Sequence, residues 1–292
     1  MKRIALRIAY DGSGYAGWQT QADGSGIQDH LQAALRGIAG HPVTLVCAGR
    51  TDAGVHALAQ IAHFDTSAER PLQAWVRGVN AHLAQARTGA GRIVVREARE
   101  VDEGFHARFR ALARGYYYLL HHAPVQQPFW SARAGWTHHT LDAQRMREAG
   151  SMLVGSHDFS AFRSSQCQAR SPCRRIESLE LLRMGTLTVI CVLANAFLHH
   201  MVRNIVGALV AIGAGAYPPE QMRVWLGARN RSLSPATFAP EGLYFAGARY
   251  PQDHAWPDRE TPWGLAPLSE LLPGVMGRDG AAATVPCAAE WA

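Results

Sequence analysis

Lysine is almost missing from this sequence of 292 residues. Lys2 is the only lysine among 29 basic side chains, so the other 28 are arginines. Arginine suits phosphate recognition, because its planar guanidinium binds oxyanions through paired hydrogen bonds and stacks on bases. A GC-rich genome, whose codons favour arginine, would give the same composition. The composition therefore favours a polyanionic partner without requiring one.

The sequence also lacks a long hydrophobic run. Its longest strongly apolar segment starts at Ile205 and extends for about 12 residues, whereas a membrane span needs about 20. The basic N-terminus does not read as a signal peptide, since Arg7 interrupts an alternating pattern that is typical of a strand. We therefore expect a cytoplasmic globular protein without a membrane span, in which the apolar segment forms a buried helix.

Paired cysteine motifs are absent. The five cysteines are irregularly spaced, and no Cys-x-x-Cys occurs: Cys47, Cys167, Cys173, Cys191 and Cys287. An odd number of cysteines in a chain without an export signal argues against a disulfide framework. The two closest cysteines have no histidine pattern beside them, which disfavours a zinc site. We expect free thiols in a reducing compartment.

Histidine motifs for metals are missing as well. There is no His-Glu-x-x-His, although three adjacent pairs occur among the 14 histidines, at 121–122, 138–139 and 199–200. Adjacent side chains of a strand point to opposite faces, so each pair offers at most one ligand to a site. Surface or core histidines are the favoured interpretation.

One glycine pattern is misleading. The segment "GSGYAG", residues 12–17, satisfies the G-x-G-x-x-G fingerprint of dinucleotide-binding folds. That fingerprint requires a helix to begin within the motif, whereas helical periodicity here starts only at Ile27. We interpret the segment as a loop with Tyr15 and Trp18 as surface aromatics.

Hydrophobic periodicity predicts an α+β fold. The fold consists of two similar α/β halves with mixed, largely antiparallel sheets flanked by helices and a basic cleft between the halves. The expected strands are 3–10, 43–49, 60–66, 91–101, 113–122, a hairpin within 178–197, and 242–251. The expected helices start near Ile27 and Met201 and after Pro219, or lie within 72–83 and 141–155.

The predicted domains are an N-terminal half at residues 1–108, a C-terminal half at 109–250 and a tail at 251–292. The first 250 residues hold 27 basic and 17 acidic side chains, a net charge of +10, whereas the tail holds six acidic and two basic ones. The tail is rich in Pro, Gly and Ala without periodicity, so we expect it to be disordered. A basic body suits a polyanionic partner.

The segment "GRTDAG" carries the strongest signal for chemistry. If its backbone is extended, Arg50 and Asp52 project to the same side. An arginine beside a carboxylate keeps it ionised, as a nucleophile or an electrostatic base requires, and Gly49 and Gly54 let the loop approach a ligand. A turn stabilised by an ion pair is the alternative interpretation.

Three other segments accompany it. Within "RGYYYLL", Tyr116 and Tyr118 share one face of a strand and Tyr117 lies on the other, so one tyrosine at least is placed to stack on a base or to pack at the edge of the core. The segment "ANAFLHHMVRNIVG" gathers polar side chains at the entry to an apolar helix, by function or by ordinary capping. Arg163 and Arg170 lie in a polar loop of the kind that contacts a phosphate backbone or is merely solvated.

Together these segments resemble the TruA family of tRNA pseudouridine synthases. The matching segments follow the family's order through about residue 250: "YDGSGYAGWQTQ", "CAGRTDAGVHA", "FHARFRALARGYYY", "DFSAFRSSQCQARSP", "ANAFLHHMVRNIVG" and "EGLYF". The resemblance implies isomerisation of uridine to pseudouridine at positions 38, 39 and 40 of the tRNA anticodon stem-loop, without metal or organic cofactor. It also implies a homodimer whose subunits together grip one tRNA.

The resemblance assigns roles to individual residues. Asp52 of "GRTD" is the catalytic residue, Tyr116 lies against the target base, and Arg203 of "HHMVRN" pairs with the catalytic aspartate. Arg50 is expected to hold or replace the flipped nucleotide. A non-catalytic tRNA-binding module and a metal hydrolase are the alternative functions.

Overall fold

The computed structural model describes residues 1–85 and 91–251. The predicted tail, residues 251–292, lies outside the described residues except for Pro251. The described chain contains ten strands: β1 (Lys2–Tyr10), β2 (Val46–Cys47), β3 (His56–Thr66), β4 (Ile93–Val101), β5 (Ala113–His122), β6 (Gly135–Thr137), β7 (Gly155–Asp158), β8 (Cys173–Met184), β9 (Leu187–Ala194) and β10 (Leu243–Arg249).

All ten strands belong to one sheet, in the order β4-β1-β3-β10-β5-β9-β8-β7, with β2 beside β3 and β6 beside β5. Neighbouring strands are antiparallel except that β10 runs parallel to β3 and β6 parallel to β5. The mixed, mostly antiparallel character was predicted correctly. The expectation of separate sheets was wrong, because β10 comes from the end of the described chain and joins β3 to β5.

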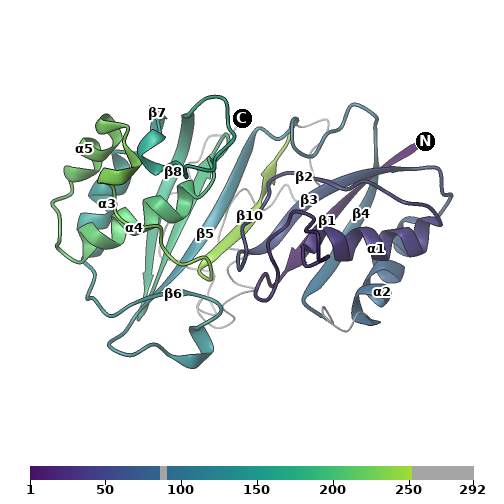
Figure 1. Ribbon diagram of the computed structural model, residues 1–292, viewed down its shortest axis with the longest axis horizontal. Coiled ribbons are helices and arrows are strands. Elements are labelled where there is room, and N and C mark those ends of the chain that lie inside the picture. Colours follow the sequence, from purple (N-terminus) through teal and green to yellow (C-terminus); the bar gives the residue numbers. More distant parts are fainter. Residues whose placement is uncertain (86–90, 252–292) are drawn as a thin grey trace, which may run out of the picture.

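β10, from the end of the described chain, lies between β3 and β5 in the sheet. In Figure 1, β10 and β5 lie in the middle, with the N-terminal strands on one side and the C-terminal strands on the other. Tyr244 of β10 pairs with His56 of β3 and with Tyr117 of β5. The loop that leads into β3 at His56 is therefore close in space to the middle of β5, although the two are far apart in sequence.

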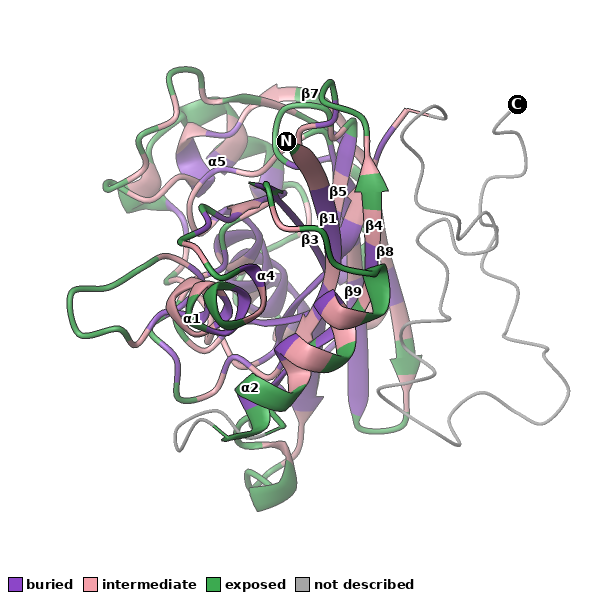
Figure 2. Ribbon diagram, turned by 90° about the vertical axis from the view of Figure 1, so that its right-hand side faces the viewer, coloured by how far each residue is buried: buried purple, intermediate pink, exposed green. Residues whose placement is uncertain are grey.

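Five α-helices are present among the described residues: α1 (Ile27–Ala39), α2 (Val79–Gln85), α3 (Ala143–Ser151), α4 (Met201–Gly213) and α5 (Gln221–Ala228). Figure 2 shows α1, α2, α4 and α5 on one side of the sheet. The main hydrophobic core fills the space between these helices and the sheet. No helix in residues 1–85 and 91–251 has the length and apolar character that crossing a membrane requires.

The predicted helix from Ile27 shows why local sequence sets its ends. The carboxylate of Asp29 accepts a hydrogen bond from the backbone N–H of Gly26 (3.0 Å), which caps the first turn, and Gly40 ends the helix with a positive φ of 75°. Ile27, Leu31 and Leu35 recur at helical spacing and are fully buried. Capping and burial thus agree, and the prediction is confirmed.

The predicted strand at 43–49 is shorter than expected, since only Val46–Cys47 pair with β3. The backbone of Leu45 is already satisfied by α1. Its N–H donates to the side chain of Gln32 (3.0 Å), and its carbonyl accepts from Gln28 (3.1 Å). A backbone whose hydrogen bonds go to side chains does not extend a sheet ladder.

Two further details differ from the predictions. The predicted helix 72–83 begins as a π-helical turn (Ala74–Gly78) before α2. The side chains of Tyr15 and Trp18 are 6% and 1% exposed, so their assignment as surface aromatics was wrong. The loop folds back onto the sheet, where Trp18 packs against Tyr10 with ring centroids 5.9 Å apart.

Candidate active site

The "GRTDAG" motif forms a loop between β2 and β3 that rests on buried side chains of the sheet. Gln60 Nε2 donates to the carbonyl oxygen of Gly49 (2.6 Å), and the hydroxyl groups of Tyr10 and Thr51 lie 2.8 Å apart. Gln60 and Tyr10 are both buried. The segment that leads up to Asp52 is therefore fixed by groups that belong to the sheet.

A second loop, residues 12–18, packs directly on the backbone of this motif. The N–H of Trp18 donates to the carbonyl of Thr51 (2.9 Å), and a side chain at Gly12 would collide with the carbonyl oxygen of Val55. Glycine is needed at residue 12 because the two backbones approach too closely for a Cβ atom. The glycine pattern thus serves loop packing, and the segment is a loop as predicted.

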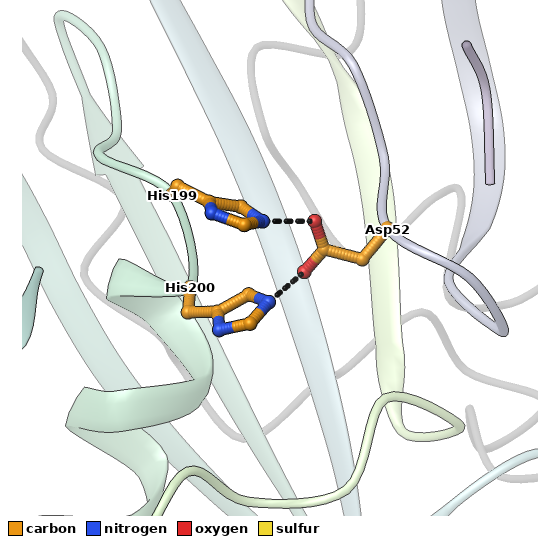
Figure 3. Close-up of side chains that lie close together, drawn as sticks. All are labelled: Asp52, His199 and His200. Atoms are coloured by element: carbon orange, nitrogen blue, oxygen red, sulfur yellow. Dashed lines mark ion pairs between the residues drawn. The ribbon is translucent and has the colours of Figure 1, made fainter. Parts of the chain in front are cut away.

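The turn before α4 lies opposite Asp52. His200, at the N-cap of α4, has a φ of 62°, a left-handed conformation that residues with a side chain rarely adopt. This turn directs the rings of both His199 and His200 at the carboxylate, as Figure 3 shows. Nε2 of His199 lies 3.3 Å from Oδ1 of Asp52, and Nε2 of His200 lies 3.4 Å from Oδ2.

Arg203, in the first turn of α4, completes the ring of basic groups. Its Nη1 donates to Oδ2 of Asp52 (3.2 Å), and its Nε donates to the carbonyl of Phe238 (2.8 Å). The side chains of Asp52 and Arg203 are 25% and 14% exposed, so solvent screens their attraction less than it screens a surface pair. Two predicted site residues that are 151 positions apart are thus in contact.

Tyr116 borders the same cluster. Its side chain is 9% exposed and lies edge-on between Phe197 and Phe245, with ring centroids 5.1 and 5.2 Å away. Burial raises the pKa of the Tyr116 hydroxyl, and the negative charge of Asp52 contributes in the same direction. The tyrosine is therefore a neutral aromatic wall near the carboxylate.

Asp52, Arg203 and Tyr116, which the motifs single out, meet at one place, and the sequence as a whole agrees with them. Residues 7–110 and 149–251 match the family described as tRNA pseudouridine synthase. The chain belongs to this family. The resemblance drawn from the motifs is thereby confirmed.

Individual relatives of this synthase family are similar over nearly their whole length. "tRNA pseudouridine synthase A" of Dechloromonas aromatica is 48% identical over 275 residues, covering 94% of this chain and 99% of the relative. The proteins of the same name from Chromobacterium violaceum and Bordetella parapertussis are 50% and 49% identical, covering 88% and 95% of this chain and 96% and 100% of theirs.

The remaining predicted site residues of this family member lie apart from Asp52. Arg50 is exposed, and no hydrogen bond or ion pair joins it to Asp52 within the described structure. Arg163 donates through Nη2 to the carbonyl oxygens of Cys167 (2.5 Å) and Ala169 (2.8 Å), and it borders a pocket that His200 also lines. Arg170 is exposed at the end of the same loop.

His199 and His200 belong to the site, although the sequence placed them only among the polar side chains at the entry to the apolar helix. The rule that adjacent histidines face opposite ways holds for strands, but these two residues lie in a turn with ring centroids 4.0 Å apart. Burial lowers the pKa of His200, and the charge of Asp52 partly offsets that effect. The left-handed conformation at His200 is the feature that a one-residue alternation rule does not anticipate.

The three side chains also form a group of the kind that holds metal ions. One oxygen of Asp52 and one ring nitrogen each from His199 and His200 lie within 4.8 Å of one another. Arg203 already donates to Oδ2 of Asp52, and its fixed positive charge opposes a cation at that oxygen. The three side chains are thus of the kinds that bind transition metals. The positive charge of Arg203, in contrast, favours an anionic or neutral substrate.

The cysteines follow the prediction where they can be seen. Cys47, Cys167, Cys173 and Cys191 are free thiols, and Cys287 lies outside the described residues. Burial raises the pKa of Cys47 to about 12, so this thiol is unreactive at neutral pH.

Proposed function

We propose that this chain isomerises uridine to pseudouridine at positions 38, 39 and 40 of the tRNA anticodon stem-loop, with Asp52 as the essential carboxylate. The observation that carries the proposal is the convergence of Asp52, Arg203 and Tyr116 from three distant segments. Family membership supports the reaction, and the convergence supports the choice of residues.

The reaction needs little more than such a cluster. The N1–C1′ bond of uridine breaks, the uracil rotates while enclosed, and a C5–C1′ bond forms. C5 then loses its proton and N1 gains one, so that the composition of the nucleotide is unchanged. An ionised Asp52 serves either of two routes, attack on C1′ or removal of the C2′ proton to give a glycal. Arg203, 3.2 Å away, holds the carboxylate in one orientation.

The target base must leave the anticodon stem before it reaches Asp52. Extrusion costs a few kcal/mol, and contact with an aromatic side chain offsets part of that cost. In the proposal Tyr116 lies against the extruded base. Arg50, exposed within the motif loop, holds or replaces the flipped nucleotide, and Arg163 and Arg170 contact phosphates.

The wider setting belongs to the same proposal. A basic cleft between an N-terminal half (residues 1–108) and a C-terminal half (109–250) receives the tRNA, in a cytoplasmic homodimer whose subunits together grip one tRNA. The net charge of +10 on residues 1–250 supports a polyanionic partner. Binding should weaken steeply with salt for the same reason.

Replacement of Asp52 tests the assignment. Asp52→Ala should abolish pseudouridine formation on a tRNA transcript while the dissociation constant for tRNA stays within about threefold, because one carboxylate adds little to phosphate-dominated affinity. Carbodiimide labelling detects pseudouridine, which has the same mass as uridine. Asp23→Ala, an exposed loop aspartate, is the matched control. Substantial activity in Asp52→Ala would contradict the assignment of Asp52 as the essential carboxylate.

Two alternatives make different predictions. A non-catalytic tRNA-binding module would bind tRNA but leave no labelled pseudouridine after incubation. A metal hydrolase is favoured by the donor set of Asp52, His199 and His200, and its activity would be lost in EDTA. Pseudouridine formation that is unchanged by EDTA excludes this second function.

A further inference from the structure

A polar pocket opens next to the catalytic cluster, on the C-terminal side. It has a volume of about 600 Å³ and lies between the 3-10 turns Ser160–Phe162 and Arg231–Leu233. Five serines and Thr237 line it, together with Arg163, Arg231 and His200. Among the described residues, no carboxylate is part of its wall. The lining offers positive charge and the hydroxyl groups of Ser164 and Ser165, while the other four hydroxyl groups already donate within the protein.

Neither arginine of this pocket is neutralised by an acid. Nη2 of Arg163 donates to the backbone carbonyls of Cys167 and Ala169. Arg231 donates through Nη1 to the carbonyl of Ser234 (2.9 Å), and no ion pair involves either guanidinium within the described part of the chain. Burial lowers the pKa of Arg231, which means that its charge is poorly solvated. An anion in the pocket would supply the missing counter-charge.

The pocket is held in place before any ligand arrives. Asn204 of α4 is 1% exposed, and its Oδ1 accepts from Nη2 of Arg231 (3.1 Å) and from the hydroxyl of Thr237 (2.6 Å). Its Nδ2 donates to the carbonyl of Phe162 (2.8 Å). This buried amide links both turns of the pocket to α4, so little ordering is needed on binding.

His200 connects the pocket to the catalytic carboxylate. It lines the pocket, and its Nε2 lies 3.4 Å from Oδ2 of Asp52. An anion bound between Arg163 and Arg231 would thus sit one side chain away from the reacting carboxylate. In an RNA strand whose uridine occupies the catalytic site, the groups at that separation are the phosphates that flank the uridine.

We propose that this pocket is a subsite for one backbone phosphate of the RNA strand that carries the target uridine. The inference rests on the proposed tRNA substrate and adds a residue, Arg231, that sequence motifs did not single out. The volume of the pocket lies in the range of pockets that enclose small ligands, so the phosphate enters with part of its sugar. The subsite fixes the strand next to Asp52.

A tethered carboxylate is the first test. Ser165 lines the pocket, is exposed, and makes no side-chain hydrogen bond within the described structure. The carboxylate of Ser165→Glu would compete with the phosphate, so the dissociation constant for an anticodon stem-loop RNA should rise about tenfold. Arg163→Gln should reduce the slope of log affinity against log salt by about one, the value for one lost phosphate contact. Ser67→Glu, at an exposed serine after β3, is the matched control.

A methylphosphonate scan identifies the phosphate. Stem-loop RNAs with one neutral methylphosphonate each are bound to the full-length wild-type protein and to Ser165→Glu. One position beside the target uridine should weaken wild-type binding about tenfold and change binding to Ser165→Glu less than twofold, since the same contact cannot be lost twice. Circular dichroism of each variant establishes that it is folded.

The outcomes separate the subsite from its rivals. Equal losses in both proteins at every position would overturn the proposal. So would a result in which inorganic phosphate raises the Tm of the wild type but not of Ser165→Glu while no RNA position shows coupling, because the pocket would then take a free anion. All these readouts are independent of pseudouridine formation, so a failure of the proposed reaction is recognised separately by the carbodiimide assay.

Discussion

The two walls of the site are built by different kinds of contact. On the N-terminal side, the loop that carries Asp52 is held through its backbone, by Gln60 and by the glycine-containing loop at residues 12–18. On the C-terminal side, the contacts to Asp52 all come from side chains at the start of α4. The backbone contacts of the two loops therefore set where the carboxylate is, and the side chains at the start of α4 set how it points and what charge it meets.

This difference should separate the effects of substitutions on activity from their effects on stability. Changes on the α4 side should reduce activity with little loss of stability, because those side chains are partly exposed and surround the proposed catalytic carboxylate. Changes where the two N-terminal loops meet should reduce stability first, because backbone groups cannot move aside. β10 joins the strands of both walls into one sheet. The loss of activity and the loss of stability can therefore be measured in the same folded protein.

Among the changes that test this difference between the walls, Arg203→Met is expected to have the largest effect. It removes the cation beside Asp52 and leaves Asp52 facing only the two histidines. We expect a loss of about 100-fold in kcat/KM, equivalent to about 2.7 kcal/mol, because the carboxylate loses the cation that orients it. The change in Tm should stay below about 3 °C, because the carboxylate of Asp52 is 25% exposed and remains in contact with solvent. Steady-state kinetics and a thermal melt measure both.

Arg223→Met is the matched control for Arg203→Met, since Arg223 is exposed on α5. It should retain full activity. If Arg203→Met instead lost stability and kept its activity, the assignment of roles to the two walls would be reversed.

A smaller effect, of the opposite kind, is expected from Gly12→Ala. The new methyl group would collide with the carbonyl oxygen of Val55, a backbone atom, so one loop must shift. Overpacking of this kind costs about 2 kcal/mol, which corresponds to a decrease in Tm of about 4–8 °C for a chain of this size. Calorimetry measures it.

Gly227→Ala provides the comparison for Gly12→Ala. Gly227 lies within α5, and a Cβ atom there meets nothing within 4 Å. Alanine has the higher helix propensity, so this variant should be neutral or slightly more stable. Equal destabilisation by both substitutions would show that the contact with Val55 does not hold the loop.

Local pattern predicted most of the fold, and the reasons are visible in particular residues. The spacing of Ile27, Leu31 and Leu35 predicts α1, because the buried positions and the capping residues define the same segment. The junction was not predictable in this way, since the pairing of Tyr244 with His56 joins residues that are far apart and carries no local signal. Single elements are encoded nearby, whereas their order in the sheet depends on contacts across the whole chain.

The histidine pairs show the same limit at the site. His121 and His122 lie on β5 and follow the alternation of a strand, with His121 stacked on Trp130 at 6.2 Å. His199 and His200 break the rule because the backbone turns left-handed between them and α4. The motif predicted Asp52 and Arg203, but only the turn reveals that both rings face the carboxylate.

The smallest effect on stability is expected from glycine substitutions that relieve a left-handed backbone conformation. His200 and Arg229 are the two non-glycine residues with positive φ in the described structure, at 62° and 52°. Glycine removes the steric cost of this conformation but adds backbone entropy to the unfolded chain, so His200→Gly and Arg229→Gly should each stabilise the fold by about 0.5 kcal/mol. Chemical denaturation resolves a change of this size.

Activity should then distinguish the two turns. His200→Gly removes a ring that lies 3.4 Å from Asp52, so its kcat/KM should fall several-fold despite the gain in stability. Arg229 ends α5, where its side chain is 68% exposed and pairs only loosely with Asp158 at 3.5 Å, so Arg229→Gly should keep full activity. A left-handed histidine that costs stability and supports activity is strain retained for the site. Equal activity of the two variants would instead make His200 an ordinary helix cap.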